Sequence, residues 1–444
     1  MPRRSSSAGG YRSRLGEGVA PLIRQWLPDR RLTNQGIAPM TEVEESHLRQ
    51  TGSDDLAGAF ARRVAAMPAP DLRAIVRMAG DAVGAASARF LVPDYAVLSL
   101  HEPGAPARTR IPIEGTLAGR SFIKDEVVSS GEAPTTVWVP VGMDSERMGV
   151  LELELPQWSG ELRPDVDALV HMLGLVLMSK RRYTDVVVRS RRSQPLSVAA
   201  EIQWELLPPL SCVTDQVSMA GMLEPAYSIG GDSFDFALNP GCAEFAIVDA
   251  VGHGMPAVLK SVIAINTLRN ARREGHSLED AYRTTGEILE AECGDFSFVT
   301  GQLGRLELDT GVLTWLNAGH PLPLLIRGDS YAGELACPPS LPMGLGGQPR
   351  AVATEHLQRG DRVLFYTDGV IESRLPNGEA FGLDRLADFV VRATLDRVHP
   401  TETVRRLSAS IVEYNGAGLS DDATILLVEY RGGPAPDDDA VPAP

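Results

Sequence analysis

Acidic residues recur beside short apolar runs in the second half of the chain. Asp232 follows two glycines, Asp249 ends the run FAIVD, and Asp368 follows DRVLFYT. A pair, Asp421 and Asp422, precedes the run ATILLVEY. Because an unpaired carboxylate is costly to bury at the end of an apolar strand, these positions need a positive partner if they converge.

A hard divalent cation would meet that need, since Mg²⁺ and Mn²⁺ prefer oxygen ligands. The chain shows no His or Cys spacing of the kind that binds zinc. Taken singly, each Asp is better explained as a turn former or a helix N-cap, which are common uses of Asp beside Gly. Taken together and in this order, they favour a metal site.

The stretch FAIVDAVGHG predicts a buried strand that ends at Asp249, a tight turn at Gly252 and Gly254, and then a helix. His253 in this turn and His320 in AGHP could each donate a proton to a leaving group. We favour the alternative for both, in which each histidine holds its turn through hydrogen bonds to nearby backbone.

From residue 217 onward the pattern predicts strands and paired helices. Strands are expected at 217–227, 244–249, 296–308, 311–317, 322–327, 361–367 and 423–430. Helices are expected at 255–273, 278–292, 383–395 and 401–414. The turn Asp309-Thr310-Gly311 should close a hairpin. Helices in consecutive pairs favour a layered α+β sandwich over an alternating, doubly wound sheet.

The first half of the chain has a different pattern. A helix is expected at 72–88, short strands at 95–100, 136–141 and 149–155, and a further helix after Pro164. The domain limits that we expect are a disordered or loosely helical arm (1–55), a small sensory domain (60–183), a helical linker (184–210), the main domain (211–431) and a disordered acidic tail (432–444). The linker helix, stopped by Pro208 and Pro209, is too apolar for an inert spacer, which favours a role in signalling.

Composition narrows the functional class. The formal net charge of -16 over 444 residues argues against nucleic acid or an anionic membrane as the main partner. The four cysteines show no CxxC pair, so no disulfide framework is indicated. No apolar run reaches the length of a membrane span, and the basic start lacks the apolar segment of a secretory signal, so we expect a cytoplasmic protein.

The ordered motifs resemble a known family. GGDSFD, VDAVGHG, LNAGHPLPLL, LPMGLG, GDRVLFYTDGVIESR and SDDATILLV together are similar to the metal-dependent type 2C (PPM) protein serine/threonine phosphatases, in their bacterial stage II sporulation protein E and RsbU-like branch. This resemblance covers about residues 195–430 and implies a four-layer α-β-β-α sandwich. Residues 60–183, with IEGTLAGRSF and GVLELEL, look like a GAF domain.

The resemblance also implies residue roles. Asp249 would bridge two Mn²⁺ or Mg²⁺ ions, with the Ala250 carbonyl on one of them. Asp368 and Asp421 would complete the second ion's ligands, and Asp249, Asp368 and Asp421 are therefore the implied catalytic residues. Asp232 would act through water, and Asp235 is a weaker candidate.

Strand register alone does not separate Asp421 from Asp422 as the metal ligand. The implied reaction is hydrolysis of phosphoserine or phosphothreonine by a metal-activated water, without a nucleophilic Cys.

By the same resemblance, the substrate would be a regulatory phosphoprotein such as an anti-sigma-factor antagonist, with activity set by the N-terminal domain. That domain could bind a small ligand or a partner protein, and the linker helix could form a homodimer. Two alternatives stay open. One is a non-catalytic signalling scaffold of the same fold, and the other is a metal-dependent hydrolase of small phosphoesters.

Overall fold

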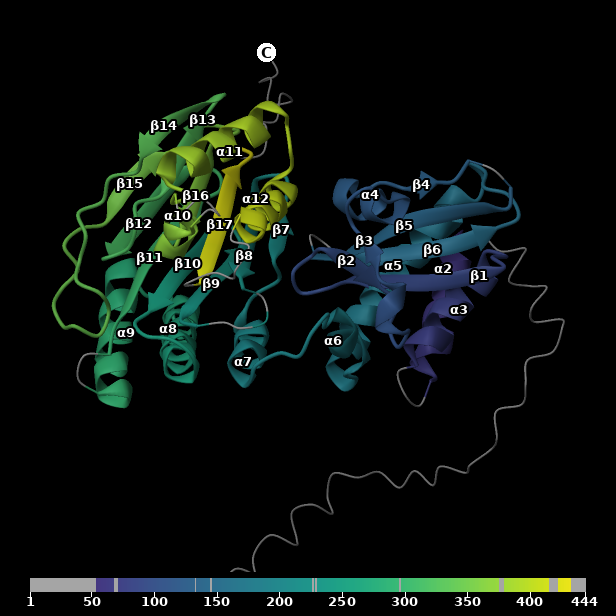
Figure 1. The fold of residues 1–444 in the computed structure, drawn as a ribbon, viewed down its shortest axis with the longest axis horizontal. Coiled ribbons are helices and arrows are strands. Elements are labelled where there is room, and N and C mark those ends of the chain that lie inside the picture. The colour runs from purple at the N-terminus through teal and green to yellow at the C-terminus, as the bar shows by residue number, and fades with distance from the viewer. Residues whose placement is uncertain are drawn as a thin grey trace, which may run out of the picture. The chain divides into compact units, whose positions relative to one another are not determined.

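The protein is described by a computed structural model that covers residues 53–67, 71–131, 133–143, 146–225, 227, 230–294, 297–374, 379–414 and 422–432. Most of the predicted arm (1–55) and nearly all of the predicted tail (432–444) lie outside these residues. Residues 50–444 form one compact unit, whose helices and strands are labelled in Figure 1. None of the helices in the described part of the chain is long and apolar enough to cross a membrane.

The N-terminal half contains a six-stranded antiparallel sheet with the order β3-β2-β1-β6-β5-β4. Helices α2, α3 and α5 cover one face of this sheet through a shared apolar core. The elements are α2 (Ser53–Ala65), α3 (Leu72–Ala82), β1 (Ser87–Pro93), β2 (Ser99–His101), β3 (Ile111–Pro112), α4 (Leu117–Lys124), β4 (Val128–Ser129), β5 (Thr135–Met143), β6 (Glu146–Leu155) and α5 (Arg163–Lys180). The expected order of helix, strands and helix is present, whereas the GAF assignment stays a prediction.

Two expected elements of this half were wrong in extent. The helix expected at 72–88 ends at Ala82, because Gly84 takes a left-handed φ of 71° and the Ala85 N–H bonds back to the Gly80 carbonyl. Of the strand expected at 95–100, only the last two residues belong to β2, and 95–98 form a turn between β1 and β2. The buried Asp94 carboxylate accepts the Leu98 N–H at 2.8 Å and thereby closes this turn.

Two short helices join the halves of the chain: α6 (Val186–Arg191) and α7 (Val198–Leu206). The Ser197 side chain caps α7 by accepting the Ala200 N–H at 3.0 Å. The helix ends before Pro208, as the sequence predicts. The linker limits at 184 and 210 stay predictions.

The C-terminal half contains two antiparallel sheets with the orders β15-β12-β11-β10-β9 and β14-β13-β16-β17-β8-β7. Its strands are β7 (Ser211–Val213), β8 (Val217–Glu224), β9 (Asp232–Asn239), β10 (Cys242–Ala250), β11 (Val299–Glu307), β12 (Val312–Ala318), β13 (Leu324–Arg327), β14 (Ser330–Glu334), β15 (Ala353–His356), β16 (Arg362–Tyr366) and β17 (Ala423–Tyr430). Its helices are α8 (Met255–Arg273), α9 (Leu278–Cys293), α10 (Asp368–Glu372), α11 (Leu383–Leu395) and α12 (Pro400–Tyr414). The hairpin predicted at Asp309-Thr310-Gly311 joins β11 to β12.

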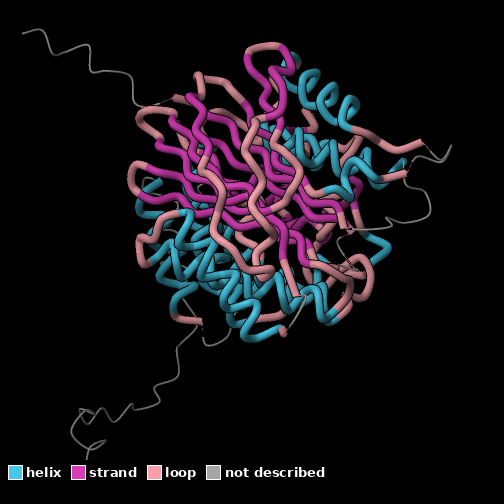
Figure 2. The backbone as a smooth tube through the Cα atoms, turned by 90° about the vertical axis from the view of Figure 1, so that its left-hand side faces the viewer, coloured by secondary structure: helices cyan, strands magenta, loops and turns pink. Residues whose placement is uncertain are grey.

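Three apolar layers hold this half together. One lies between the two sheets and contains Phe234, Trp315 and Phe365. A second lies between the first sheet and helices α8 and α9, and a third lies between the second sheet and helices α11 and α12. Figure 2 shows the strands with helices on both sides. The predicted order of helix, sheet, sheet and helix layers agrees with these contacts.

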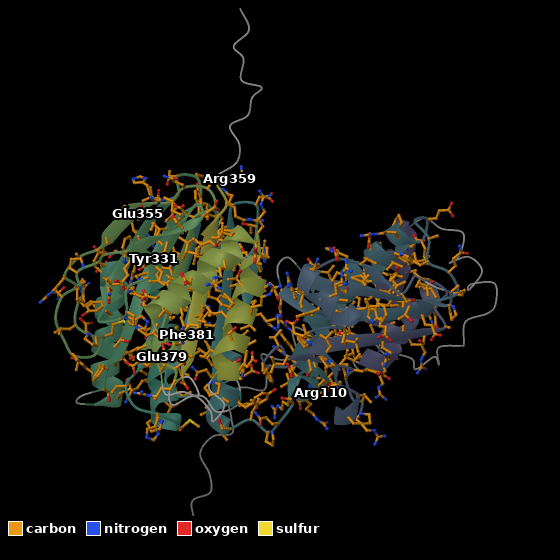
Figure 3. The ribbon with its side chains drawn as sticks, turned by 45° about the horizontal axis from the view of Figure 1, so that its top comes forward. Arg110, Tyr331, Glu355, Arg359, Glu379 and Phe381 are labelled. Carbon is orange, nitrogen blue, oxygen red and sulfur yellow. The ribbon has the colours of Figure 1, made fainter. Side chains whose placement is uncertain are left out.

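Arg327 ties the two sheets at one edge. From β13 its guanidinium donates to Glu355 of β15 at 3.0 Å and to the buried Asp361 carboxylate at 2.7 Å. Figure 3 labels Glu355 in the C-terminal half, with Tyr331 of β14.

Candidate functional site

Polar side chains extend the apolar layer between the two sheets at one end. Phe234 of β9 and Ile247 of β10 belong to that layer. Because side chains alternate along a strand, Asp232 and Asp249 face the same space, each two residues from its apolar neighbour. On the opposite sheet, Thr367 follows Phe365 by the same spacing. Both sheets therefore direct polar groups to one end of the sandwich.

Asp232 and Asp249 lie directly opposite each other in the register of β9 and β10. Asp232 is only 3% exposed, whereas Asp249 is half-buried. Burial is the largest cause that raises the pKa of Asp232 well above its usual value, followed by the negative charges of Asp249 and Asp422. A cation between these carboxylates would offset both effects.

Thr367 connects this acidic pair to the second sheet. Its buried hydroxyl donates to Asp232 Oδ2 at 2.6 Å and accepts the Thr424 N–H at 2.9 Å. The hydrogen bond from Thr367 opposes the rise in the pKa of Asp232. Our search of the sequence for acidic residues missed Thr367. The alternation of inward-facing side chains along β16, from Val363 to Phe365, would have indicated that Thr367 faces the site.

The loop before β17 contacts both the segment 230–232 and the start of α10 at Gly369. Asp422 is buried, and its Oδ2 accepts the Gly230 N–H at 2.6 Å and the Asp232 N–H at 3.4 Å. A Cβ on Gly369 would overlap the Asp422 carbonyl oxygen, so this close approach requires glycine. Exposed Asp368, the first residue of α10, is next to that contact. Asp421 lies outside the described residues.

Contacts with Gly231 and with α8 fix the end of β10 and the turn that follows it. A Cβ on Gly231 would overlap the Ala250 carbonyl oxygen, and the Ala250 N–H donates to the Gly231 carbonyl at 3.2 Å. The buried Ser261 hydroxyl of α8 donates to the same carbonyl. Gly252 and Gly254 adopt φ angles of 101° and 66°, which explains the need for glycine in this turn.

The two histidines differ in their surroundings. His253 is exposed in the turn. His320 is buried, and its ring Nδ1 lies 2.8 Å from the Thr300 hydroxyl. Its backbone N–H donates to Asn317 Oδ1 at 2.7 Å. Burial lowers the pKa of His320 to about 3, so it stays neutral at physiological pH. These contacts support the structural role that the sequence favoured for His320.

Asp235, the weaker candidate from the sequence, does not face the site. It lies on the opposite face of β9 from Asp232, because three residues separate them. Its buried carboxylate pairs with Arg269 at 2.6 Å and with Arg272 at 2.8 Å, both on α8. The role considered for Asp235 as an indirect metal ligand was therefore wrong, and the residue attaches β9 to α8.

The donor set fits a hard divalent ion in part. Its groups are carboxylate and carbonyl oxygens, and burial, followed by the charges of Asp249 and Asp422, raises the pKa of Asp232. Within the residues that the structure covers, no three His, Cys, Asp or Glu side chains form a group that could hold a metal ion. Asp421 is not among the residues searched, so the described part supplies two opposed carboxylates and the backbone around them.

Comparisons with known proteins identify a matching family and several relatives. Residues 239–431 match the family described as Stage II sporulation protein E (SpoIIE). Phosphoserine phosphatase RsbU of Bacillus subtilis is 22% identical over 287 residues, which cover 64% of this chain and 84% of RsbU. Protein IcfG of Synechocystis sp. is 23% identical over 267 residues, which cover 53% of this chain and 41% of IcfG.

Among solved structures, the RsbU and RsbW domains of Rv1364c from Mycobacterium tuberculosis are 26% identical, with a TM-score of 0.44. That match covers 52% of this chain and 64% of the other. The chain therefore spans less than two thirds of that structure and of IcfG, and most of RsbU.

Proposed function

We propose that the SpoIIE-type phosphatase domain to which residues 239–431 belong hydrolyses phosphoserine or phosphothreonine on a regulatory protein with the help of two Mn²⁺ or Mg²⁺ ions. The observation that carries the proposal is the opposed pair Asp232 and Asp249, in which burial, followed by repulsion from Asp249, raises the pKa of Asp232. Two adjacent carboxylates in a buried position are poorly explained as turn formers. They are well explained as cation ligands.

We assign the ligands as the resemblance implies. Asp249 would be shared by the two ions, the Ala250 carbonyl would bind one, and Asp368 and Asp421 would bind the other. Asp232 would act through water. The Asp422 carboxylate already accepts two backbone N–H groups, which favours Asp421 over Asp422 as the ligand.

The chain's own residues prepare the site for an in-line attack. Divalent ions, if held there, would supply an activated water nucleophile and offset charge on the phosphoryl oxygens. Thr367 holds the Asp232 carboxylate in one orientation. Gly231 and Gly369 let the backbone of three segments approach closely. The neutral, buried His320 supports the strand end beside Asp249 through Thr300, which is the register partner of Asp249.

We further propose that the substrate is a phosphorylated partner protein of the anti-sigma-factor-antagonist kind, because the relative RsbU carries the name phosphoserine phosphatase. The N-terminal half, which we interpret as a GAF-like sensor, would set the activity through α6 and α7. A homodimer through these linker helices is part of the same proposal. The protein would act in the cytoplasm.

The test is Mn²⁺-dependent release of phosphate from a phosphoserine protein. We expect Asp249→Ala and Asp368→Ala to lower kcat/KM at least a hundredfold, whereas Asp388→Ala, on the exposed face of α11, serves as the matched control. Full activity in either site variant would overturn the two-metal assignment. A rate on p-nitrophenyl phosphate that exceeds the rate on phosphoprotein would favour the small-phosphoester alternative. No phosphate release with intact folding would favour the scaffold alternative.

A paired comparison separates the two adjacent acids. Asp421→Ala should weaken Mn²⁺ binding, measured by calorimetry, and leave the free energy of unfolding nearly unchanged. Asp422→Ala should lower the free energy of unfolding by about 1–3 kcal/mol, because it leaves the Gly230 and Asp232 N–H groups without their acceptor. The reverse pattern would show that Asp422 is the ligand.

A further inference from the structure

A cavity of about 750 Å³ lies where α6 and α7 meet the N-terminal sheet and the C-terminal half. Its walls include Tyr95, Arg147, Arg191, Trp204 and Met222. The volume is in the range of pockets that bind small molecules, which are usually apolar with a few converging polar groups. None of the acidic residues assigned above lines it, so the cavity is separate from the proposed phosphatase site.

Arg191 is a half-buried cation in this wall that forms no ion pair with the described residues. Its guanidinium lies 4.5 Å from the ring centre of Tyr95 and 5.8 Å from that of Trp204. Nε is buried and has no hydrogen-bond partner, and no carboxylate in the described part of the chain lies within 4.0 Å of the guanidinium. Burial is the main cause that lowers the pKa of Arg191. Aromatic contacts alone replace only part of the lost hydration.

Arg147 presents a second guanidinium of the same kind. Its Nη1 donates to the Ile123 carbonyl at 2.8 Å, and among the described residues it forms no ion pair. Burial also lowers the pKa of Arg147. A neutral carbonyl satisfies one of the five N–H donors of the group. The wall thus contains two arginines that form no ion pair within 4.0 Å with the described residues.

The carboxylates of the wall either form ion pairs, two of them with Arg181 and Arg405 of the same wall, or are exposed. Glu146 pairs with Arg181 at 2.6 Å, Glu201 with Arg192 at 2.5 Å, and Glu402 with Arg405 at 2.7 Å. The two others, Asp185 and Glu205, are exposed. Apart from exposed Arg182, Arg147 and Arg191 are therefore the cations of the wall that form no ion pair within the described part of the chain.

We infer that this cavity binds a small organic anion, whose charged group contacts Arg147 and Arg191 and whose apolar body packs against Tyr95 and Trp204. The aromatic rings and the cavity volume favour an organic body over an inorganic ion. A ligand there touches α7 directly, so it would reach the segment that precedes the C-terminal half. The inference goes beyond the proposed function and does not depend on it.

The test uses the full chain and two fluorescent probes of similar shape. 8-Anilinonaphthalene-1-sulfonate carries a sulfonate, and N-phenyl-1-naphthylamine is its neutral counterpart. We expect the wild-type protein to bind one equivalent of the sulfonate at least tenfold more tightly than the neutral probe. Arg147→Gln and Arg191→Gln should each weaken sulfonate binding at least fivefold and change binding of the neutral probe less than twofold.

Charge-retaining and distant variants are the controls. Arg191→Lys should keep most of the sulfonate affinity, and it also serves if Arg191→Gln does not fold, as judged by circular dichroism. Arg120→Gln, an exposed change in the same half, should have no effect. Equal affinity of the wild type for the two probes would overturn the inference. Unchanged sulfonate binding in both glutamine variants would do so as well.

Discussion

At the scale of single residues, Thr367 decides how the buried Asp232 carboxylate is presented. Its hydroxyl donates to Asp232 and accepts from the backbone of Thr424, so the proton can point only toward the carboxylate. Valine has the same shape without the donor. We expect Thr367→Val to raise the pKa of Asp232 further and to lower kcat/KM for phosphoprotein about tenfold or more. The free energy of unfolding should fall by about 1–3 kcal/mol.

Thr367→Ser is the matched control, because serine restores the donor. It should recover most of the activity and of the Mn²⁺ affinity, which calorimetry would measure in parallel. If the valine variant is as active as the wild type at limiting Mn²⁺, Thr367 is a packing residue and not a positioning residue.

At the scale of elements, the close approach of α10 to the loop before β17 depends on Gly369. A Cβ there would overlap the Asp422 carbonyl oxygen, which belongs to the backbone and cannot turn away. Gly369→Ala should therefore lower the free energy of unfolding by about 1–3 kcal/mol, as overpacking does in a core. Activity should fall more than stability, because Asp368 moves with the helix.

Gly160→Ala is the comparison, since a Cβ at this position meets nothing within 4 Å. Urea unfolding and phosphate release on both variants provide the measurement. A Gly369→Ala protein as stable and active as Gly160→Ala would contradict the close packing of α10.

At the scale of elements, the local sequence pattern predicted some helices and strands and not others. The helices α8 and α11 begin and end at the predicted residues, because each has an apolar face and glycine just before its first turn. Strand β9 was missed, since Asp232 and Asp235 interrupt its apolar pattern and are satisfied only by distant residues. The exposed edge strands β14 and β15 carry no clear alternation and were missed as well.

Part of the acidic cluster was visible in the sequence because Asp249 and Asp368 follow apolar runs and Asp422 precedes one. In the structure Asp232 and Asp249 are register partners, and Asp422 accepts the Asp232 N–H. The backbone of Gly369, the residue after Asp368, packs against the Asp422 carbonyl. The hydroxyl groups of Thr367 and Thr300 were not predicted, since they act through partners far apart in sequence. Asp235 shows the opposite error, because an acid near the motif pairs with arginines on the other face of the strand.

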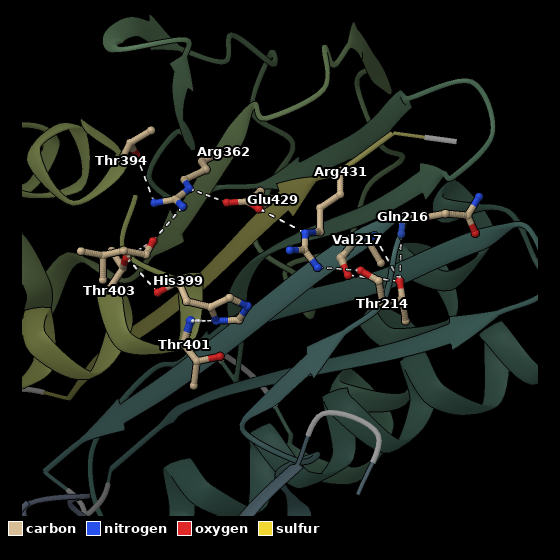
Figure 4. A network of polar contacts seen from close by, with 11 residues as sticks. Thr214, Gln216, Val217, Arg362, Thr394, His399, Thr401, Thr403, Glu429 and Arg431 are labelled. Carbon is tan, nitrogen blue, oxygen red and sulfur yellow. Dashed lines mark hydrogen bonds and ion pairs between the residues drawn. The ribbon is translucent and has the colours of Figure 1, made fainter. Parts of the chain in front are cut away.

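At the scale of the whole molecule, a polar network joins α11 and α12 to the second sheet (Figure 4). Arg362 of β16 pairs with Glu429 of β17 at 2.7 Å and donates to the Val398 carbonyl at 2.9 Å, next to His399. Arg431 donates to the Thr214 carbonyl at 2.9 Å. The network thus links the end of β17, the loop before α12 and the start of β8 in a region of excess positive charge.

That charge makes His399 a source of pH-dependent stability. Burial, followed by Arg147, Arg431 and Arg362, lowers the pKa of His399 from 6.5 to about 4. The folded protein thus binds its proton more weakly than the unfolded chain does. The stabilising contribution is present above pH 6.5 and is lost as the pH falls from 6.5 toward 4.

We expect His399→Asn to reduce the loss of unfolding free energy between pH 7.5 and 5 by about 1 kcal/mol, a value discounted for the partial exposure of the ring. Urea titrations at both pH values measure it, with exposed His356→Asn as the control. An unchanged difference between the two pH values would mean that His399 is not the group responsible, because asparagine cannot take up the proton that the unfolded histidine binds.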